Sequence, residues 1–505
     1  MLTTLIRREL LDNLMTFRFA ATVFIMLMLV VAATFVLIID YERRLASYND
    51  AVKTYQQEVQ DAKTYALGIR KLSIDRPPNP MSIFNVGLDK RLGNEIGISH
   101  EFVPSLWDAE AHGADNSFLN IFASIDIIFI FQVVLSLLAL VFAYDAIVGE
   151  RELGTLRLVL THPVSRGQIL LAKYVSTMLC LLIPLLISLL FAMILIATST
   201  SISLKTDDFL RIIGIVFASI AYLSVFYLIG MLISAVTRRT STALMMSMFV
   251  WGFLVLAYPN MIIAVTNPSQ PSKAQTASVY NHIKQIWEEF DRERKHFLAT
   301  DAVPGEDPAF GMDGPAGWGG GDGFGENQLT LMYYYWSVLF FSEFYDRHLP
   351  QVRHAQNYYE FLGPRIINTA DRMWLIRKSA LDDIFVQPAS VATNLLKLSP
   401  VGLYDAVTQA WAGTDLNGIQ DFFEAARHYR RTVINYLYDR KAFGSREWFA
   451  ADQAEADWST LPQFSFQRSD VATNAKRVFP DLFLLIITNV ILFIIIFLIF
   501  IKSEV

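Results

Sequence analysis

Six long apolar blocks alternate with polar segments along the 505 residues of the chain. A helix needs about 20 apolar residues to cross a bilayer, and each block approaches or exceeds that length. The first block, Ala20 to Ile39, contains no charged side chain. The pattern predicts an all-α polytopic membrane protein, with six transmembrane helices expected at residues 17–39, 121–144, 169–197, 212–236, 243–265 and 478–502.

Lysines and arginines in the short polar segments indicate the orientation of the chain, because such residues are disfavoured in short translocated loops. They occur near the N-terminus, between the second and third blocks, between the fourth and fifth, and after the sixth: Arg7, Arg8, Arg18, Arg151, Arg157, Arg166, Lys173, Arg238, Arg239 and Lys502. These segments alternate correctly across six spans. We therefore expect both termini, residues 145–168, the turn at 237–242 and the tail at 503–505 to be cytoplasmic.

The opposite side of the membrane receives a first external segment at 40–120, a short loop at 198–211 and a large external domain at 266–477. Apolar residues recur at helical spacing between Val279 and Phe297 and again between Phe423 and Leu437, so this domain is expected to be mainly helical. The stretch from Leu45 to Leu67 is typical of a helix that leaves the membrane. Residues 311–325 are too rich in glycine for regular structure and predict a loop.

Composition agrees with this picture and excludes several functions. Hydrophobic residues make up 53% of the chain and charged residues 18%, which is typical of a protein solvated by lipid. The formal charge of −6 argues against nucleic acid as a partner. Cys180 is the single cysteine and lies in an apolar block, so no disulfide framework is expected. The first block is too long for a signal peptide and is interpreted as a retained anchor.

The segment from Gly149 to Lys173 carries the most specific pattern. It begins with charges, continues through leucines at helical spacing, is interrupted at Pro163 and leads directly into the third span. A cytoplasmic helix tied to two spans could transmit a push from a soluble partner. The alternative is an ordinary interfacial loop whose arginines extend to the headgroups.

This segment resembles the coupling segment of the ABC-2 type permeases. The similarity includes Glu150, the triplet Gly154 to Leu156, the run Pro163 to Arg166, and Lys173 at the start of span three. Residues 1–16 look like that family's amphipathic connecting helix, and Gly230 to Trp251 resembles its junction of spans four and five. The resemblance implies a set of ATPase-coupling residues: Glu150, Arg151, Gly154, Thr155, Leu156, Pro163 and Arg166.

The resemblance also implies partners and a location. The chain would be a permease subunit in a bacterial inner membrane, pairing with a second permease copy or a paralogous permease and with ABC ATPase subunits. No GxxxxGK[ST] phosphate-binding motif occurs in the sequence, so ATP and Mg are expected on the partner ATPase and no cofactor on this chain. The family's external loops are typically short, and the two large insertions depart from that pattern. Leu398 to Arg431 resembles a subfamily of large ABC-2 permeases grouped with permeases of multicopper enzyme maturation.

Few other residues suggest a site. Asp126, Gln132 and Asn260 are polar groups within apolar blocks, where polar side chains are often functional. They could equally lie at the membrane surface, where they cost little. The histidines, among them His348, His354 and His428, have no metal-ligand spacing, so no metal site is expected. No arrangement of catalytic side chains is recognisable, and we expect a transporter subunit rather than an enzyme.

Three functions follow from these observations. The first is a permease driven by a separate ATPase, exporting a substrate that the sequence does not identify. The second keeps the ATPase but uses its work on a periplasmic protein, for example in mechanotransmission or the maturation of a multicopper enzyme. The third is a membrane sensor or scaffold that has no ATPase.

Overall fold

The apolar blocks form helices, because a helix satisfies every backbone N–H and C=O group within the segment and lipid offers no other partner. A computed structural model describes residues 2–106, 109, 125–155, 165–266, 273–301, 350–451 and 453–502. In these ranges six helical stretches are long and apolar enough to cross a membrane: Phe17–Gln60, Ile127–Glu152, Arg166–Thr198, Thr206–Val236, Thr240–Thr266 and Val471–Lys502. The prediction of an all-α fold with six membrane helices is confirmed.

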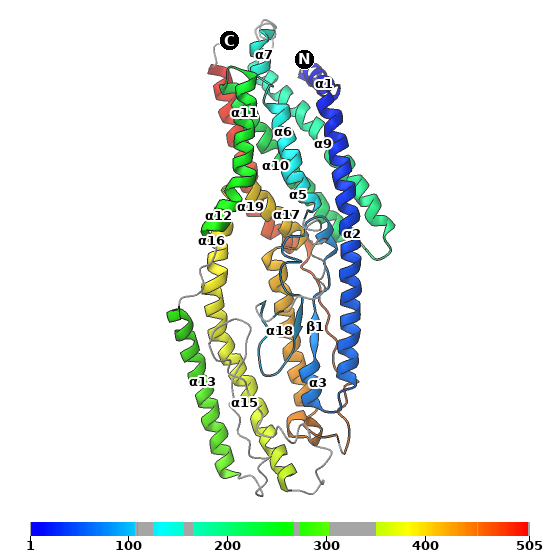
Figure 1. The fold of residues 1–505 in the computed structure, drawn as a ribbon, viewed down its shortest axis with the longest axis vertical. Helices are drawn as coiled ribbons and strands as arrows, with labels where there is room; N and C mark the ends of the chain where they lie inside the picture. The colour runs from blue at the N-terminus through cyan, green and yellow to red at the C-terminus, as the bar shows by residue number, and fades with distance from the viewer. Residues whose placement is uncertain are drawn as a thin grey trace.

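The molecule is elongated and has two halves (Figure 1). One half is the bundle of membrane helices, and both chain termini lie at its far end, which we call the termini end. The other half, which we call the helical extension, is built mainly from α3 (Tyr65–Lys71), α13 (Lys273–Thr300), α15 (Pro350–Leu381) and α18 (Leu416–Asp439). Helices α13 and α18 include the two stretches for which helical periodicity is predicted.

The first membrane helix connects the halves. Helix α2 (Phe17–Gln60) has 44 residues, which at 1.5 Å per residue gives a length of about 66 Å. The apolar layer of a bilayer is only about 30 Å thick, so α2 continues well beyond it. Figure 1 shows α2 running from the termini end into the extension, in agreement with the helix expected to leave the membrane.

The remaining elements of the bundle are the N-terminal helix, short connecting helices and the other spanning helices. Two spans contain a π-helical turn, η3 and η4, where the regular backbone pattern shifts by one residue. The bounds are α1 (Leu2–Leu14), α5 (Ile127–Ile130), η3 (Phe131–Leu135), α6 (Ser136–Ala143), α7 (Val148–Glu152), α9 (Arg166–Thr198), α10 (Thr206–Val236), α11 (Thr240–Trp251), η4 (Gly252–Ala257), α12 (Tyr258–Thr266) and α19 (Val471–Lys502).

Helix α10 forms the centre of the bundle. Its Tyr222, Phe226 and Tyr227 are fully buried, and it packs against α19, α6 and α17 (Pro400–Ala412). The Tyr222 hydroxyl donates to the carbonyl of Gln132 at 2.8 Å, within the π-helical turn. The ring of Tyr222 also stacks on that of Tyr404 of α17, with centroids 4.3 Å apart.

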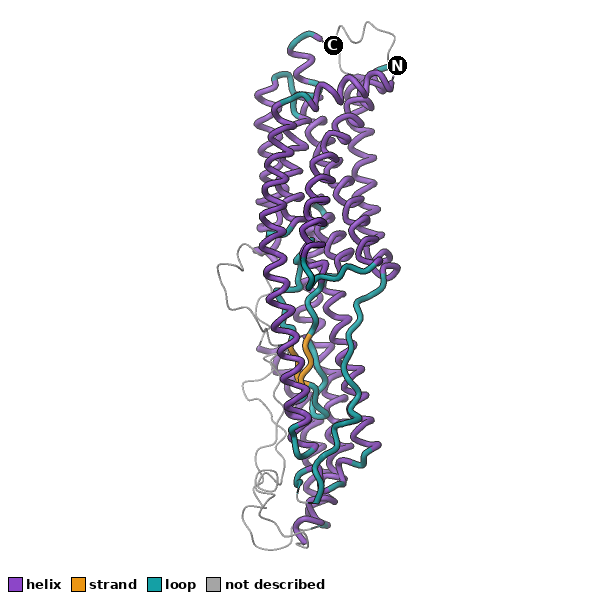
Figure 2. The backbone as a smooth tube through the Cα atoms, turned by 90° about the vertical axis from the view of Figure 1, so that its right-hand side faces the viewer, coloured by secondary structure: helices purple, strands orange, loops and turns teal. Residues whose placement is uncertain are grey.

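The extension has its own core. Tyr358 and Tyr359 of α15, Phe422 and Phe423 of α18, and Trp448 are fully buried there. A short antiparallel hairpin of β1 (Ser73–Asp75) and β2 (Glu95–Gly97) lies beside these helices, with Ile74 opposite Ile96. Figure 2 shows it as the orange segment in the lower half. Further connections are η1 (Pro80–Ile83), η7 (Asp382–Val386), α16 (Gln387–Leu396), η8 (Ala442–Gly444) and η9 (Arg446–Trp448).

Buried charges fasten the extension to the bundle. Asp208, in the first turn of α10, is completely buried and accepts a hydrogen bond from Arg468 at 3.0 Å. Arg211, one turn later, donates to the carbonyls of Trp411 and Ser469. Because a buried carboxylate without its partner is costly, these contacts favour a fixed connection between the two halves.

Candidate functional site

Residues of the predicted coupling segment lie at the termini end of the bundle, where α7 meets α9 and α11. The structure describes Glu150, Arg151, Gly154, Thr155 and Arg166. Two further residues of the predicted set, Leu156 and Pro163, lie outside the described residues. The glycine-rich loop at 311–325 and His348 do as well.

Lys173 is the centre of this region. It belongs to the third span, is 7% exposed, and its ammonium donates to Glu150 at 2.6 Å and to Glu9 at 3.1 Å. Burying an ammonium costs several kcal/mol unless it is paired and hydrogen-bonded. The two carboxylates provide that pairing, and they join α1, α7 and α9 through one side chain. Glu150 therefore has a partner within the chain.

Two contacts connect α7 to the turn between the fourth and fifth spans. Arg151 donates to the carbonyls of Thr237 and Ala235, at 3.1 and 3.3 Å. Glu152 accepts from the backbone N–H and the hydroxyl of Thr240, at 3.1 and 2.9 Å. Movement of α7 would therefore be transmitted to α10 and α11 as well as to α9.

The described turn after α7 projects outward. Gly154 has φ +74°, a left-handed conformation that favours glycine, and no atom lies within 4 Å of where its Cβ would be. The Thr155 hydroxyl donates to the carbonyl of Glu150 at 3.2 Å. Leu153 is 79% exposed. An apolar side chain so exposed beside a charged helix is available to a partner.

Arg166 begins the third span. A capping box formed by Ser165 and Gln168 starts this helix directly before Arg166. The Arg166 guanidinium donates to the carbonyls of Phe500 and Ile501, at 3.1 and 2.7 Å. Near the C-terminus of a helix these carbonyls have no partner within the helix, so Arg166 fastens α9 to the end of α19.

The three intramembrane polar candidates have different positions. Asp126 caps the N-terminus of α5, accepting from the backbone N–H groups of Phe129 at 2.6 Å and Val86 at 2.8 Å. Gln132 lies two turns into the same span. Asn260 is exposed and donates to the carbonyl of Leu256 in its own helix at 2.7 Å. The structure thus brings Asp126 and Gln132 together and leaves Asn260 apart.

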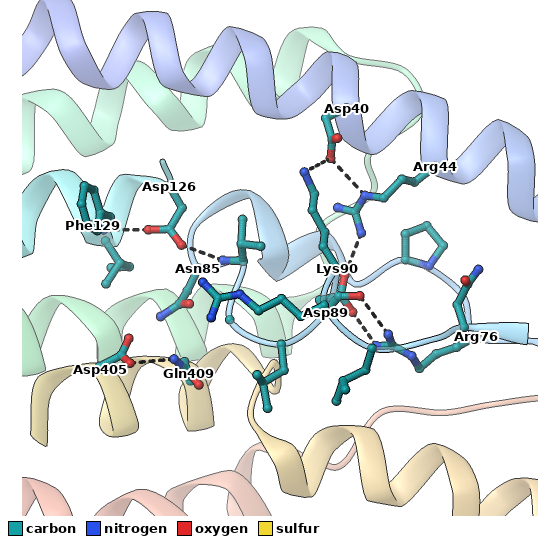
Figure 3. A pocket seen from close by; sticks show the side chains of 18 of the residues that line it. Asp40, Arg44, Arg76, Asn85, Asp89, Lys90, Asp126, Phe129, Asp405 and Gln409 are labelled. Atoms are coloured by element: carbon teal, nitrogen blue, oxygen red, sulfur yellow. Dashed lines mark hydrogen bonds and ion pairs between the residues drawn. The ribbon is translucent and has the colours of Figure 1, made fainter. Parts of the chain in front are cut away.

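Asp126 and Gln132 line a cavity of about 470 Å³ between the bundle and the extension. We call it the junction pocket. Its walls come from α2, the segment 76–94, the start of the second span and α17 (Figure 3). Sequence reasoning missed this pocket, because its side chains come from four segments that are far apart in the chain.

Charged side chains at one end of the junction pocket are paired. Asp89 accepts from Arg76 at 2.6 Å and from Arg44 at 2.7 Å. Asp40 accepts from Lys90 at 2.6 Å and from Arg44 at 3.0 Å. Burial alone would raise the pKa of Asp89, but the two guanidiniums outweigh it and hold that pKa below its usual value.

Carboxylates at the other end lack such partners. Asp405 accepts from the amide of Gln409 at 2.8 Å, and among the described residues no ion pair joins Asp126 or Asp405 to a cation. Burial raises the pKa of Asp405, although the Gln409 amide and the charge of Arg91 act against the shift. The two ends of the pocket therefore differ in how far their negative charge is compensated.

The described residues of both regions lack the ligand sets that bind metal ions. Within the described ranges, no group of three or more histidine, cysteine, aspartate or glutamate side chains could hold a metal ion. His354 is buried beside Asp301, with Nδ1 3.2 Å from the carboxylate. The expectation that this chain binds no cofactor stays a prediction.

Comparisons with known proteins agree with the arrangement of the spans. The profile of the family described as ABC-2 family transporter protein matches residues 3–302, more than half of the chain. A domain of unknown function, DUF3526, matches residues 387–467, which include α17 and α18.

Two curated relatives are each called a probable ABC transporter permease protein NosY. That of Pseudomonas aeruginosa is 34% identical over 137 residues, 26% of this chain and 49% of the relative. That of Stutzerimonas stutzeri is 35% identical over 138 residues, 26% of this chain and 47% of the relative. The match with this chain thus spans about half the length of these relatives.

Proposed function

The chain belongs to the ABC-2 transporter family as a multi-pass membrane permease, and from this premise we propose that a separate ABC ATPase drives it through residues 149–166. The family match carries the proposal, because it extends over the segment between the second and third spans. ATP and Mg then bind the partner, since this chain contains no GxxxxGK[ST] motif.

The contacts at the termini end support force transmission through this segment. The Lys173 cluster joins α7 to α1 and α9, and Arg151 joins it to the end of α10. A push on α7 would therefore act on α1 and on the membrane helices α9 and α10 together. In a solvated loop without such contacts, the same push would move the loop and leave the membrane helices in place.

The orientation in this proposal follows from the charges of the short segments. The termini end faces the cytoplasm and the extension lies outside a bacterial inner membrane. The permease acts as a pair, with a second copy or a paralogous permease. The fifth span, which exposes Met245 and Phe249 strongly, would face lipid or that second permease.

Export of a substrate is one use of this machinery, and mechanical work on a periplasmic protein is the other. The continuous helix α2 favours the second use, because a helix of about 66 Å can carry movement from the bundle into the extension. The name NosY refers to the relatives alone, so neither a copper enzyme nor any other cargo is assigned. Measuring whether a substrate moves across the membrane of proteoliposomes would separate export from mechanical work.

Purification of the tagged full chain from its host tests the presence of the ATPase. We expect an ABC ATPase to co-purify with the parent chain and expect Leu153→Ser to reduce its yield at least tenfold. Leu153 is 79% exposed, so its loss should change the free energy of unfolding by no more than about 0.5 kcal/mol. Glu150→Lys is a poorer test, because it also places a second ammonium beside Lys173.

Met15→Ser is the matched control, since Met15 is similarly exposed at the termini end but lies outside the coupling segment. It should leave the ATPase yield unchanged. If no ATPase accompanies the parent chain, the sensor or scaffold function is correct. An unchanged yield with Leu153→Ser would make the segment an ordinary interfacial loop.

A further inference from the structure

The junction pocket lies where membrane helices end. Asp40 directly follows the apolar run of the first span, and Asp126 directly precedes the second. Headgroups of lipids occupy this level of a bilayer. A cavity here can therefore receive a polar group from the membrane as well as from water.

The two ends of the pocket attract different charges. In Figure 3 Asp126, Asn85, Asp405 and Gln409 lie at one end, and Asp40, Lys90, Arg44, Asp89 and Arg76 lie at the other. At the second end three cations, Lys90, Arg44 and Arg76, face two carboxylates, Asp40 and Asp89, so the charge there is positive on balance and favours an anion over a further cation. The carboxylates Asp126 and Asp405 have no ion pair with a described residue, so a ligand cation is most favourable beside them.

The polar groups beside these carboxylates suit a cation that has N–H groups. Asn85 is 2% exposed, and its amide nitrogen donates to Thr408 at 3.0 Å, which turns the amide carbonyl away from that contact. Gln132 and Gln409 add amide groups to the lining. A quaternary ammonium would need a cage of aromatic rings, whereas among the described residues Phe129 is the one aromatic side chain that lines this end of the pocket.

Apolar side chains border the pocket on the membrane side. Phe129 lines it and is 45% exposed. Ile39, which directly precedes Asp40 within the first span, is also exposed. An acyl chain could lie on this surface while its headgroup occupies the cavity. The volume of about 470 Å³ lies within the range typical of sites for small ligands.

We propose that the junction pocket binds a membrane amphiphile whose headgroup carries a phosphate and a primary ammonium, with the ammonium beside Asp126 and Asp405 and the phosphate toward Lys90 and Arg44. The binding requires no ATPase and is independent of the proposed function. It assigns to this chain a lipid site at the base of the extension, where an occupant contacts α2 and α17 together.

Short-chain phospholipids test the proposal on the purified full chain in detergent. The probes are dihexanoyl-phosphatidylethanolamine, the choline lipid of the same chain length, and free phosphoethanolamine, with thermal stabilisation as the readout. We expect the ethanolamine lipid to bind at least tenfold more tightly than the other two. Equal affinity for the choline lipid would overturn the recognition of a primary ammonium. Equal affinity for free phosphoethanolamine would show that the pocket does not require a lipid, and would overturn the proposal that its ligand comes from the membrane.

Variants locate the binding. Asp405→Asn should weaken the ethanolamine lipid at least tenfold, while Asp439→Asn, on the exposed surface of α18, should not change it. Arg91→Gln removes an exposed cation whose charge acts on both carboxylates, and should tighten binding about threefold. This variant keeps the test valid if Asp405→Asn does not fold. Unchanged binding in Asp405→Asn would overturn the proposed position of the ammonium. So would binding in Arg91→Gln that is unchanged or weaker.

Discussion

His100 and Glu101 are sequence neighbours in the extension whose pKa values are displaced in opposite directions. Burial, helped by the charges of Arg430 and Arg70, lowers the pKa of His100 to about 3. Burial raises the pKa of Glu101 to about 7, although Arg70 opposes the shift. His100 lies edge-on against Trp448, with ring centroids 5.3 Å apart. The folded chain therefore favours the uncharged forms of both side chains.

Glu101→Gln tests this at the residue scale. Between pH 4.5 and about 7 the folded chain keeps a proton on Glu101 that the unfolded chain releases, so this group's contribution to stability is lost as the pH rises through about 7. Glutamine should remove that loss. We expect the same Tm as the parent at pH 4 and a higher Tm at pH 8, measured by tryptophan fluorescence. His100 is present in both proteins, so its effect cancels. A Tm difference that is equal at both pH values would contradict the shifted pKa.

Sequence reasoning at this scale finds individual residues but not their partners. Lys173 is conspicuous at the start of an apolar block, but Glu9 lies 164 residues away and no local pattern connects the two. Asp126 is recognisable as a polar residue in an apolar block, and the structure adds that it is a helix cap. Asn260 matches the same criterion, but its hydrogen bond within the described part of the chain is a local one, to Leu256 of its own helix.

At the scale of elements, glycines determine how closely the spans approach. A Cβ added at Gly230 of α10 would lie 2.5 Å from the Cβ of Ala143, closer than packed atoms allow. The second and fourth spans can therefore meet only because residue 230 has no side chain. Gly252, in the fifth span, has no atom within 4 Å of the corresponding position.

Alanine substitutions at these two glycines should have opposite effects. Gly230→Ala should push α10 away from α6 and reduce stability by about 1–3 kcal/mol. Gly252→Ala should leave stability unchanged or increase it, because alanine favours a helix more than glycine does. The Tm of each variant in detergent measures this difference. Equal Tm values for the two variants would show that the close approach of α10 and α6 is not required.

The apolar blocks predict the membrane helices well, because burial in lipid requires long runs without charge. They predict the ends of helices less well. Helix α2 continues to Gln60 although its sequence becomes polar after Ile39, since packing against the extension replaces lipid as its environment. The π-helical turns η3 and η4 leave no comparable trace in the apolar pattern.

At the scale of the whole molecule, the relation between the halves is the feature that sequence could not predict. The six spans and a helical external domain follow from periodicity, but the contacts of Asp208, Arg211 and Arg468 join segments about 260 residues apart. The junction pocket forms between the halves for the same reason. Its lining residues come from separate segments and meet where α17 packs against α10.

The proposed contact between an ABC ATPase and the coupling segment at the termini end can be trapped by cross-linking. The most direct measurement places a photoreactive amino acid at Leu153 in intact cells, and in a second strain at Leu375, which is similarly exposed but lies on α15 of the extension. After illumination, we predict a covalent adduct between the chain and an ABC ATPase from position 153 and none from position 375. Absence of the adduct at 153, or its formation at 375, would rule out the coupling segment as the ATPase contact.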